Sequence, residues 1–305
     1  MAPRPLERPS LLVVKVGGSC LEELEPEWWD RLAELCRAGD GDGDRAGARG
    51  DGHARGPGPP KLVVVHGWSR MVSAETPDGQ PDFIVDKHGF RSRYTTEAVL
   101  EQIVRVSGEL RGRIAAVLRE RGLDVGEAEG AESGLLRAEV RQNMWWVGEE
   151  LVPLTNLVGP VREVDCSRLD VLLAEHDAVV VTPLAKTPDH PRVNTDADRA
   201  AAAIAGAGGA ERLVLVMDAE AVLADGEPVR HATRADLKQL ATHAKGGMLK
   251  KLRAVEEAFA HGVDQVAIGR ASVPALLAGD TGTVIVNSAV EGGAHPAGVR
   301  DTADG

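Results

Sequence analysis

Aromatic residues and cysteines are scarce in this chain of 305 residues. Aromatics make up only 3% of it, so its core has to be built from Val, Leu, Ala and Ile. The three cysteines, Cys20, Cys36 and Cys166, are far apart, with no CxxC or Cys/His spacing. This pattern favours neither a zinc site nor a disulfide framework, and we predict no metal held by protein ligands.

Long apolar runs and an excess of positive charge are also missing. No apolar run approaches the ~20 residues that a membrane-spanning helix needs, and Lys15 interrupts the first one before a signal-peptide core is complete. We therefore expect a cytoplasmic protein without a membrane partner. The 35 Lys and Arg against 47 Asp and Glu give a formal net charge of −12. A general nucleic-acid binder would have a basic footprint instead, so we expect no nucleic-acid partner.

Two stretches contain too few apolar residues to order themselves. Ala38–Pro60 is rich in Gly, Asp, Arg and Pro, which predicts a disordered insertion. The end of the chain, Asn287–Gly305, is predicted to be a flexible tail. We expect the remainder of residues 1–286 to form a single domain.

Short β-branched runs alternate with segments of helical period, which predicts parallel βαβ units with helices on both faces of a sheet. The predicted strands are Leu11–Val16, Leu62–Val65, Ala178–Thr182, Leu213–Val216, Gln265–Ile268 and Thr283–Val286. The predicted helices are Leu21–Cys36, Glu97–Arg121, Cys166–Glu175, Asp198–Ala207, Arg234–His243 and Met248–His261. The segment Asn143–Asp165, with Trp145 and Trp146, is typical of a pair of strands in a hairpin. In such an α/β fold, ligands bind beyond the carboxyl ends of the strands.

Glycines follow the first two predicted strands, in "KVGGS" (Lys15–Ser19) and "HGWSR" (His66–Arg70). Glycine lets backbone amides approach an anion closely, because no Cβ intervenes. A lysine in a buried strand is costly unless an anion meets its amine. Neither stretch is a P-loop or a dinucleotide fingerprint. Ordinary turns and an edge-strand lysine that reaches solvent remain the alternative.

Three later stretches combine polar side chains in a similar way. In "RVNTDADRAAAAIAG", Asn194, Asp196 and Asp198 supply more polar groups than a helix cap needs. In "GGMLKKLRAVEEAF", Lys250 and Lys251 oppose the helix dipole, which an anionic ligand would explain for at least one of them. For Lys250, a solvated surface position is the alternative.

The stretch "GFRSRYT" places two arginines, Arg91 and Arg93, after a glycine. Arginine suits bidentate capture of a carboxylate. The alternative is a pair of surface arginines ahead of a helix that is capped by Thr95 or Thr96.

Taken in order, "KVGGS … HGWS … SRYT … NTDAD … MDAEAVL … GGMLKK … GTVI" resembles the amino acid kinase family, which includes acetylglutamate kinases. The resemblance implies a three-layer α/β/α sandwich with a mainly parallel central sheet. It implies a substrate lobe over about residues 1–190 and a nucleotide lobe over about 191–286. "SRYT" and "RVSGELRGRIAAVLRERG" are most similar to the branch of aminoadipate/glutamate kinases whose substrate is linked to a small acidic amino-group carrier protein.

The resemblance implies that ATP, with nucleotide-bound Mg²⁺, phosphorylates the side-chain carboxylate of an N-capped acidic amino acid to an acyl phosphate. It also implies a carrier-protein partner and a homodimer formed through Glu97–Arg121. Free N-acetylglutamate as substrate, a phosphate or carbamate kinase, and a catalytically impaired pseudokinase or scaffold are the alternatives.

Residue roles are carried over from the family position by position. Lys15 matches a lysine on the transferring phosphoryl group, Lys251 one on the leaving-group side, and Asp198 an aspartate that orients both. The other ATP-site residues are Gly17, Gly18, Ser19 and Asp218, and those of the substrate site are Gly67, Trp68, Arg91, Arg93, Asn194 and Asp196. Within the substrate site, the arginines match a carboxylate grip and Asn194 a contact to the α-substituent.

Three features depart from the family pattern. Trp68 replaces a glycine, so its indole is expected to narrow the pocket, stack on a substrate or block the site. "PLTNLVGPVREVD" replaces an Arg-Asp-Asp-Tyr-type stretch, and the insertion has no family counterpart, which indicates a specialised pathway.

Basic residues of the amino-side lobe are predicted to attract an acidic carrier, with a solvated helix face as the alternative. They are Lys87, Arg91, Arg93, Arg111, Arg113, Arg119 and Arg121.

Overall fold

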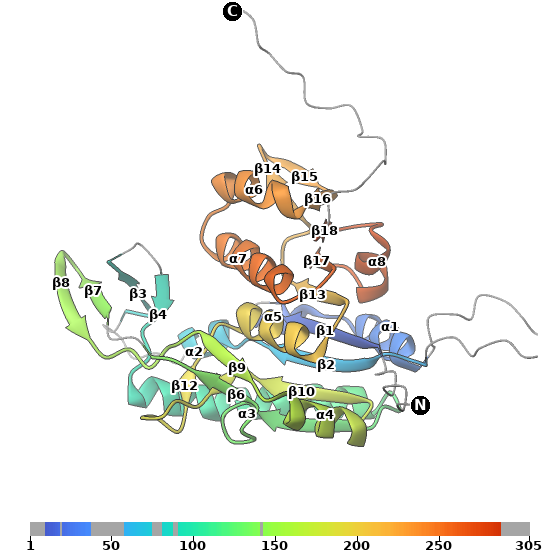
Figure 1. The fold of residues 1–305 in the computed structure, drawn as a ribbon, viewed down its shortest axis with the longest axis horizontal. Helices are drawn as coiled ribbons and strands as arrows, with labels where there is room; N and C mark the ends of the chain where they lie inside the picture. Colours follow the sequence, from blue (N-terminus) through green and yellow to red (C-terminus); the bar gives the residue numbers. More distant parts are fainter. Residues whose placement is uncertain are drawn as a thin grey trace, which may run out of the picture.

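The computed structural model describes residues 10–18, 20–37, 58–74, 81–87, 91–140 and 143–287. Ser19, the predicted tail from residue 288 and most of the predicted insertion (38–57) lie outside these ranges. The chain forms an eight-stranded sheet between two layers of helices, so the predicted α/β/α sandwich is confirmed (Figure 1).

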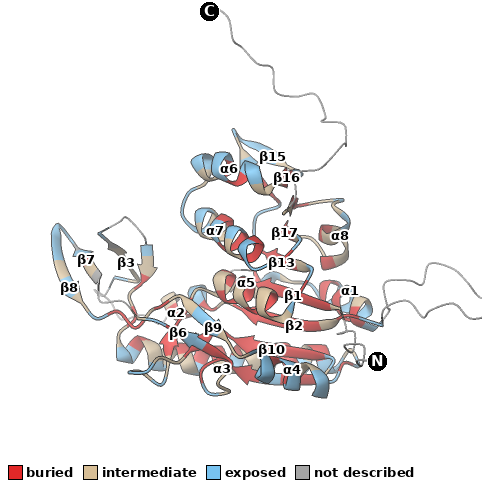
Figure 2. Ribbon diagram, viewed as in Figure 1, coloured by how far each residue is buried: buried red, intermediate tan, exposed pale blue. Residues whose placement is uncertain are grey.

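The central sheet has the strand order β16-β18-β17-β13-β1-β2-β10-β5. Every neighbouring pair is parallel except β17 with β18. The strands are β1 (Leu11–Val16), β2 (Lys61–His66), β5 (Val125–Glu129), β10 (Ala178–Thr182), β13 (Arg212–Val216), β16 (His231–Thr233), β17 (Gln265–Gly269) and β18 (Thr283–Val286). Every residue of β1 and β10 is buried, because helices cover both faces of a mainly parallel sheet (Figure 2).

Two helical layers enclose two apolar cores. On one face lie α4 (Cys166–Glu175), α5 (Ala197–Gly208) and α7 (Gly247–Ala260), and on the other α1 (Pro26–Arg37), α3 (Glu97–Arg119) and α8 (Val273–Ala278). Polar side chains begin three of these helices: Thr96 accepts a hydrogen bond from Val99 N, Asp165 from Arg168 N, and Asp196 from the amides of Asp198 and Arg199. A left-handed Gly209 (φ 68°) ends α5.

A smaller antiparallel sheet projects beside the central one, at the left of Figure 1. Its order is β4 (Arg91–Arg93), β3 (Phe83–Asp86), β7 (Asn143–Val147) and β8 (Glu150–Leu154). The hairpin predicted around Trp145 and Trp146 is therefore present in β7 and β8, whereas the end of the predicted segment, Val161–Val164, forms a strand of another pair. The remaining helical elements are α2 (Ser69–Ala74), α6 (Leu237–His243) and two 3₁₀ turns (Leu21–Glu23, Arg234–Asp236). Three short strand pairs complete the described chain: β6 (Leu136–Ala138) with β9 (Val161–Val164), β11 (Leu184–Ala185) with β12 (Val193–Asn194), and β14 (Val222–Ala224) with β15 (Glu227–Val229).

Two sequence predictions need correction. The helix predicted over Leu21–Cys36 is a 3₁₀ turn followed by α1, because Pro26 lacks an amide hydrogen and suits the first position of a helix. Two strands of the central sheet were missed: β5, since "VGEAE" contains a glycine and two glutamates, and β16, which is only three residues long. In the described part of the chain, no helix is both long and apolar enough to span a bilayer.

Candidate active site

The loops that follow β1 and β2 touch one another at the carboxyl edge of the sheet. Gly17 N donates to Val216 O at 3.1 Å, and Gly67 N donates to Val16 O at 2.9 Å. A Cβ on Gly18 would lie 2.8 Å from Trp68 N and 2.9 Å from Gly67 C, which are backbone atoms. The two glycine loops therefore pack at a distance that only glycine allows at this point.

Three charged side chains meet beside these loops. Lys15 Nζ lies 2.7 Å from Asp198 Oδ1, and Lys251 Nζ lies 2.9 Å from Asp198 Oδ2. The lysines come from β1 and α7, and the carboxylate from the first turn of α5. All three side chains are at least largely buried, with exposed fractions of 7%, 8% and 13% for Lys15, Asp198 and Lys251.

The cluster keeps a net positive charge in a buried place. Burial favours the neutral form of Asp198, but Lys15 and Lys251 outweigh it and lower the pKa of this carboxyl to about 2. Burial opposes the charge of Lys15, and Asp198 outweighs it, so the pKa of Lys15 is raised. Burial and then Lys15 lower the pKa of Lys251. Two lysines around one carboxylate leave a site that an additional anion stabilises.

A cavity of about 550 Å³ opens over this cluster, within the size range of small-molecule sites. The first residues of α7 line it, so the amides at the start of that helix border the cavity. Its predicted lining residues are Lys15, Gly17, Gly18, Gly67, Arg91, Asp196, Asp198, Asp218 and Lys251; Ser69, Arg70, Phe83, Ala197, Met217, Ala219, Gly246, Gly247, Met248 and Lys250 complete the wall.

A smaller cavity of about 110 Å³ adjoins the larger one and shares part of its wall, including Gly67, Asp196 and Lys250. The predicted residues Trp68, Arg93 and Asn194 line only this smaller cavity. Each predicted site residue that the structure describes therefore borders one of the two adjoining cavities. The predicted Ser19 lies outside the described residues.

Arg93 is already engaged within the chain. Its Nη2 donates to Ser69 O at 2.9 Å and to Ser73 Oγ at 2.8 Å, and its Nη1 lies 3.5 Å from Asp82 Oδ1. Burial lowers the pKa of Arg93 and Asp82 opposes that shift. The guanidinium thus forms the cavity wall with its charge partly balanced. Arg91, in contrast, is exposed and stacks 3.8 Å above the centroid of the Phe83 ring.

The Trp68 side chain packs into a core. It is 4% exposed and belongs to an apolar cluster with Val72 of α2, Ile103 and Leu110 of α3, and Leu184. The indole therefore fills space beside α2 and α3, and no bound substrate is needed to explain its burial. Trp68 also borders the smaller cavity, so it forms part of that wall.

Several wall residues carried no signal in the sequence. Phe83 and Met217 belong to ordinary apolar runs, and only the fold brings them to the cavities. Thr195 also lines the smaller cavity, and its place between the predicted site residues Asn194 and Asp196 was the one sequence signal that could have indicated this. A buried network fixes Asn194, whose Nδ2 donates to Thr95 Oγ1 at 3.1 Å, while Thr95 N donates to Asn156 Oδ1 at 2.8 Å.

The arginines of α3 do not form a free basic surface. Arg111 and Arg119 both pair with Glu127, at 3.4 and 3.0 Å, and Arg121 pairs with Asp30 at 2.7 Å. These contacts favour the alternative of a helix face that is balanced within the chain. Lys87, which follows β3, and Arg91, on β4, are exposed members of the predicted basic set in the small sheet, and Arg91 lines the larger cavity.

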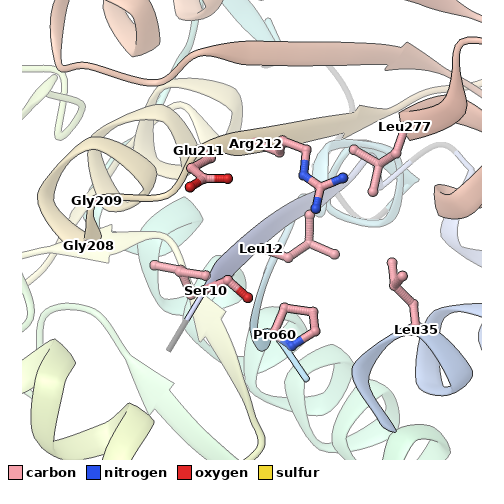
Figure 3. Close-up of a pocket in the computed structure, with 10 residues that line it drawn as sticks. Ser10, Leu12, Leu35, Pro60, Gly208, Gly209, Glu211, Arg212 and Leu277 are labelled. Atoms are coloured by element: carbon pink, nitrogen blue, oxygen red, sulfur yellow. The ribbon is translucent and has the colours of Figure 1, made fainter. Parts of the chain in front are cut away.

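Another cavity, of about 160 Å³, lies where the strands begin (Figure 3). Ser10 and Leu12 at the start of β1, Pro60 before β2, and Arg212 at the start of β13 line it. It is at the amino edge of the sheet and gathers none of the predicted site residues.

Comparison with known proteins agrees with this architecture. The family model described as the amino acid kinase family matches residues 10–270. The chain belongs to the amino acid kinase family. Among curated relatives, a protein of Cenarchaeum symbiosum named putative [LysW]-aminoadipate/[LysW]-glutamate kinase is 29% identical over 90% of this chain and 99% of its own length. A [LysW]-aminoadipate/[LysW]-glutamate kinase of Saccharolobus islandicus is 32% identical over 74% of this chain and 89% of its own.

Solved structures of lower identity share the fold. N-acetylglutamate synthase from Neisseria gonorrhoeae, complexed with coenzyme A and N-acetyl-glutamate, has a TM-score of 0.69 at 21% identity, over 92% of this chain and 60% of that one. Carbamate kinase from Giardia lamblia, bound to AMP-PNP, has a TM-score of 0.60 at 12% identity, over 93% and 100% of the two chains.

Proposed function

We propose that this chain transfers the γ-phosphoryl group of ATP to the side-chain carboxylate of an N-capped acidic amino acid, such as aminoadipate or glutamate. Membership of the amino acid kinase family, together with curated relatives named as aminoadipate/glutamate kinases, makes the chain an ATP-dependent phosphotransferase with a carboxyl group as acceptor. The observation that carries the finer proposal is the buried Lys15–Asp198–Lys251 cluster beside two adjoining cavities of unequal size.

The larger cavity suits the nucleotide. Its wall combines three lysines, Lys15, Lys250 and Lys251, with the amino end of α7, which are groups that bind phosphates. The glycine loops after β1 and β2 complete this wall, with the amides of Gly17 and Gly67 already donating to backbone carbonyls. Mg²⁺ bound to ATP would supply charge neutralisation to the phosphates. In the described part of the chain, no group of three or more His, Cys, Asp or Glu is arranged to hold a metal ion.

The smaller cavity suits the acid. A carboxylate oxygen attacks the γ-phosphorus, the bond from phosphorus to the β–γ bridging oxygen breaks, and ADP and an acyl phosphate are formed. The acid is ionised at neutral pH, so no general base is needed. In this reaction Lys15 stabilises the moving phosphoryl group, Lys251 the leaving oxygen, and Asp198 holds both amines in place.

We further propose that the amino group of the acid is attached to a small acidic carrier protein. The names of the two curated relatives support this, because both include a LysW-linked substrate. The resemblance of "SRYT" and α3 to that branch points the same way. The alternative is free N-acetylglutamate as the substrate, and the experiment has to distinguish it from a carrier-linked acid.

The test is ADP release in the presence of hydroxylamine, which converts an acyl phosphate to a hydroxamate. N-acetylglutamate and N-acetylaminoadipate are compared with the same acids linked to a small acidic carrier. Hydroxamate from carrier-linked acids alone supports both parts of the proposal. Hydroxamate from the free acids overturns the proposal that the substrate is linked to a carrier protein. Binding of ATP without turnover of any acid overturns the proposal that the chain is an active kinase.

A further inference from the structure

A lysine at the junction of the two cavities has no partner within the described chain. Lys250 borders both the larger and the smaller cavity and is half-buried. No hydrogen bond or ion pair joins it to another described residue. Lys15 and Lys251 differ in this respect because they share Asp198, and Arg93 lies against Asp82, while Arg91 stacks on the Phe83 ring.

The position of Lys250 on α7 makes an unpaired charge unfavourable. The helix begins at Gly247 and runs for 14 residues, so Lys250 lies in its first turns, where the dipole repels a cation. Partial burial adds a desolvation cost. A bound anion at the junction removes both costs.

The chemistry of the smaller cavity identifies which anion fits. Ser92, Asn194 and Thr195 offer neutral polar groups there, and Arg93 contributes a charge that Asp82 partly balances. Asp196 also lines this cavity, and its carboxylate accepts hydrogen bonds from the first amides of α5, at Asp198 and Arg199. An N-capped acidic amino acid brings two carboxylates, one of which reacts at the Lys15 cluster. The other carboxylate stays unreacted and needs a cation on the wall of the smaller cavity.

We propose that Lys250 binds this second, non-reacting carboxylate and so makes the enzyme specific for dicarboxylic acids. The inference rests on the proposed function and assigns to Lys250 the grip that the family pattern gives to Arg93. Arg93 then acts mainly in shaping the wall, through its bonds to Ser69 and Ser73. Arg91 is a weaker candidate, because it borders the larger cavity but not the smaller one.

The test compares two substrates in wild-type and Lys250→Met proteins, by hydroxamate formation. One substrate is N-acetylaminoadipate, and the other is 5-acetamidopentanoate, the same chain without the second carboxylate. If the wild type needs another N-cap, the same pair carries that cap. Wild type should prefer the dicarboxylic acid, and Lys250→Met should lose about 10- to 100-fold of that preference in kcat/KM, as expected for a charge-assisted hydrogen bond. Activity on the monocarboxylic acid should fall less, because a loss that both acids share would come from the place of Lys250 on the wall of the larger cavity.

Lys245→Met is the matched control, since Lys245 is an exposed lysine just before α7 that borders neither cavity. Lys250→Arg should recover part of the preference. An unchanged preference in Lys250→Met, with an active wild type, overturns this inference alone. An equal loss on both acids also overturns it, because Lys250 would then act on the phosphates. A wild type that phosphorylates no acid overturns the proposed function itself.

Discussion

Among single residues, Lys15 has the most demanding surroundings. Its amine is buried at the end of β1 and is held 2.7 Å from Asp198. An ionised pair of this kind costs desolvation energy, and its retention is explained if a further anion arrives during the reaction. The apolar run "LLVVKV" therefore contains a charge because the strand ends where phosphate is proposed to bind.

Substitution of Lys15 tests this role. Lys15→Ala should lower kcat by about 10²–10³-fold, because a cation aimed at the charge of the transition state is lost. Hydroxamate formation at saturating ATP measures the rate, and thermal unfolding checks that the protein is folded. Lys61→Ala is the control, since Lys61 lies at the amino end of neighbouring β2 and pairs with Asp177 at 3.4 Å. Near-normal turnover in Lys15→Ala would contradict the proposed mechanism.

His66 is a second residue whose surroundings can be tested, here through pH. Burial, and then the charge of Arg111, lower the pKa of His66 from about 6.5 to about 3. Its Nε2 lies 3.1 Å from Thr182 Oγ1. Between these two pH values the unfolded chain binds a proton that the folded chain does not. The contribution of neutral His66 to the free energy of unfolding is therefore complete above about pH 6.5, and it declines as the pH falls toward 3.

The expected decline is about 1.4 kcal/mol per pH unit below about pH 6. Urea unfolding at several pH values between 5 and 8 measures it. His66→Gln keeps an amide that can bond to Thr182 but does not titrate, so this part of the slope should disappear. Equal slopes in the two proteins would show that His66 does not titrate in this way.

At the scale of elements, the contact between the two glycine loops sets the shape of the site. A Cβ on Gly18 meets the backbone of Gly67 and Trp68 at 2.8–2.9 Å, so a loop has to move. Gly18→Ala should cost about 1–3 kcal/mol of stability through overpacking, and should lower kcat because the amides shift. Urea unfolding and hydroxamate formation measure the two effects.

Helix α3 supplies the matched control. Gly112 lies within it, and a Cβ there meets nothing within 4 Å. Gly112→Ala should therefore raise stability by about 0.5–1 kcal/mol and leave activity unchanged, since alanine is the better helix former. If both substitutions have the same effect, the loop contact is not what restricts Gly18.

The elements also show which parts of the molecule the sequence can reveal. Strands such as β1 and β10 were predicted closely, because buried parallel strands are continuous β-branched runs. Strand β5 was not, since its charged Glu127 lies at the sheet edge and meets arginines of α3. The packing of Trp68 and the hydrogen bonds of Arg93 could not be predicted either, because their partners on α2 and α3 come together only in the folded chain.

The whole molecule carries a net charge of −12, which repels an acidic partner at long range. The arginines of α3 cannot offset this fully, because Glu127 and Asp30 already balance several of them. The proposed carrier protein would therefore have to be attracted locally. Arg91 is exposed and lines the larger cavity, and Lys87 is exposed at the end of β3 in the same small sheet, so these two groups are the candidates for doing so.

Salt should separate a carrier-linked substrate from a free acid. Raising the salt from about 0.1 M to about 1 M shortens the Debye length from ~10 Å to ~3 Å, so attraction between exposed charges is largely lost. The KM for a carrier-linked acid should rise by roughly 3- to 10-fold, because encounter slows. The KM for a free acid should change less, because the buried lysines act at short range. Lys87→Gln with Arg91→Gln should weaken the salt effect, whereas Arg113→Gln on α3 should preserve it. An equal effect of salt on both kinds of substrate would remove electrostatic docking of a carrier from the proposal.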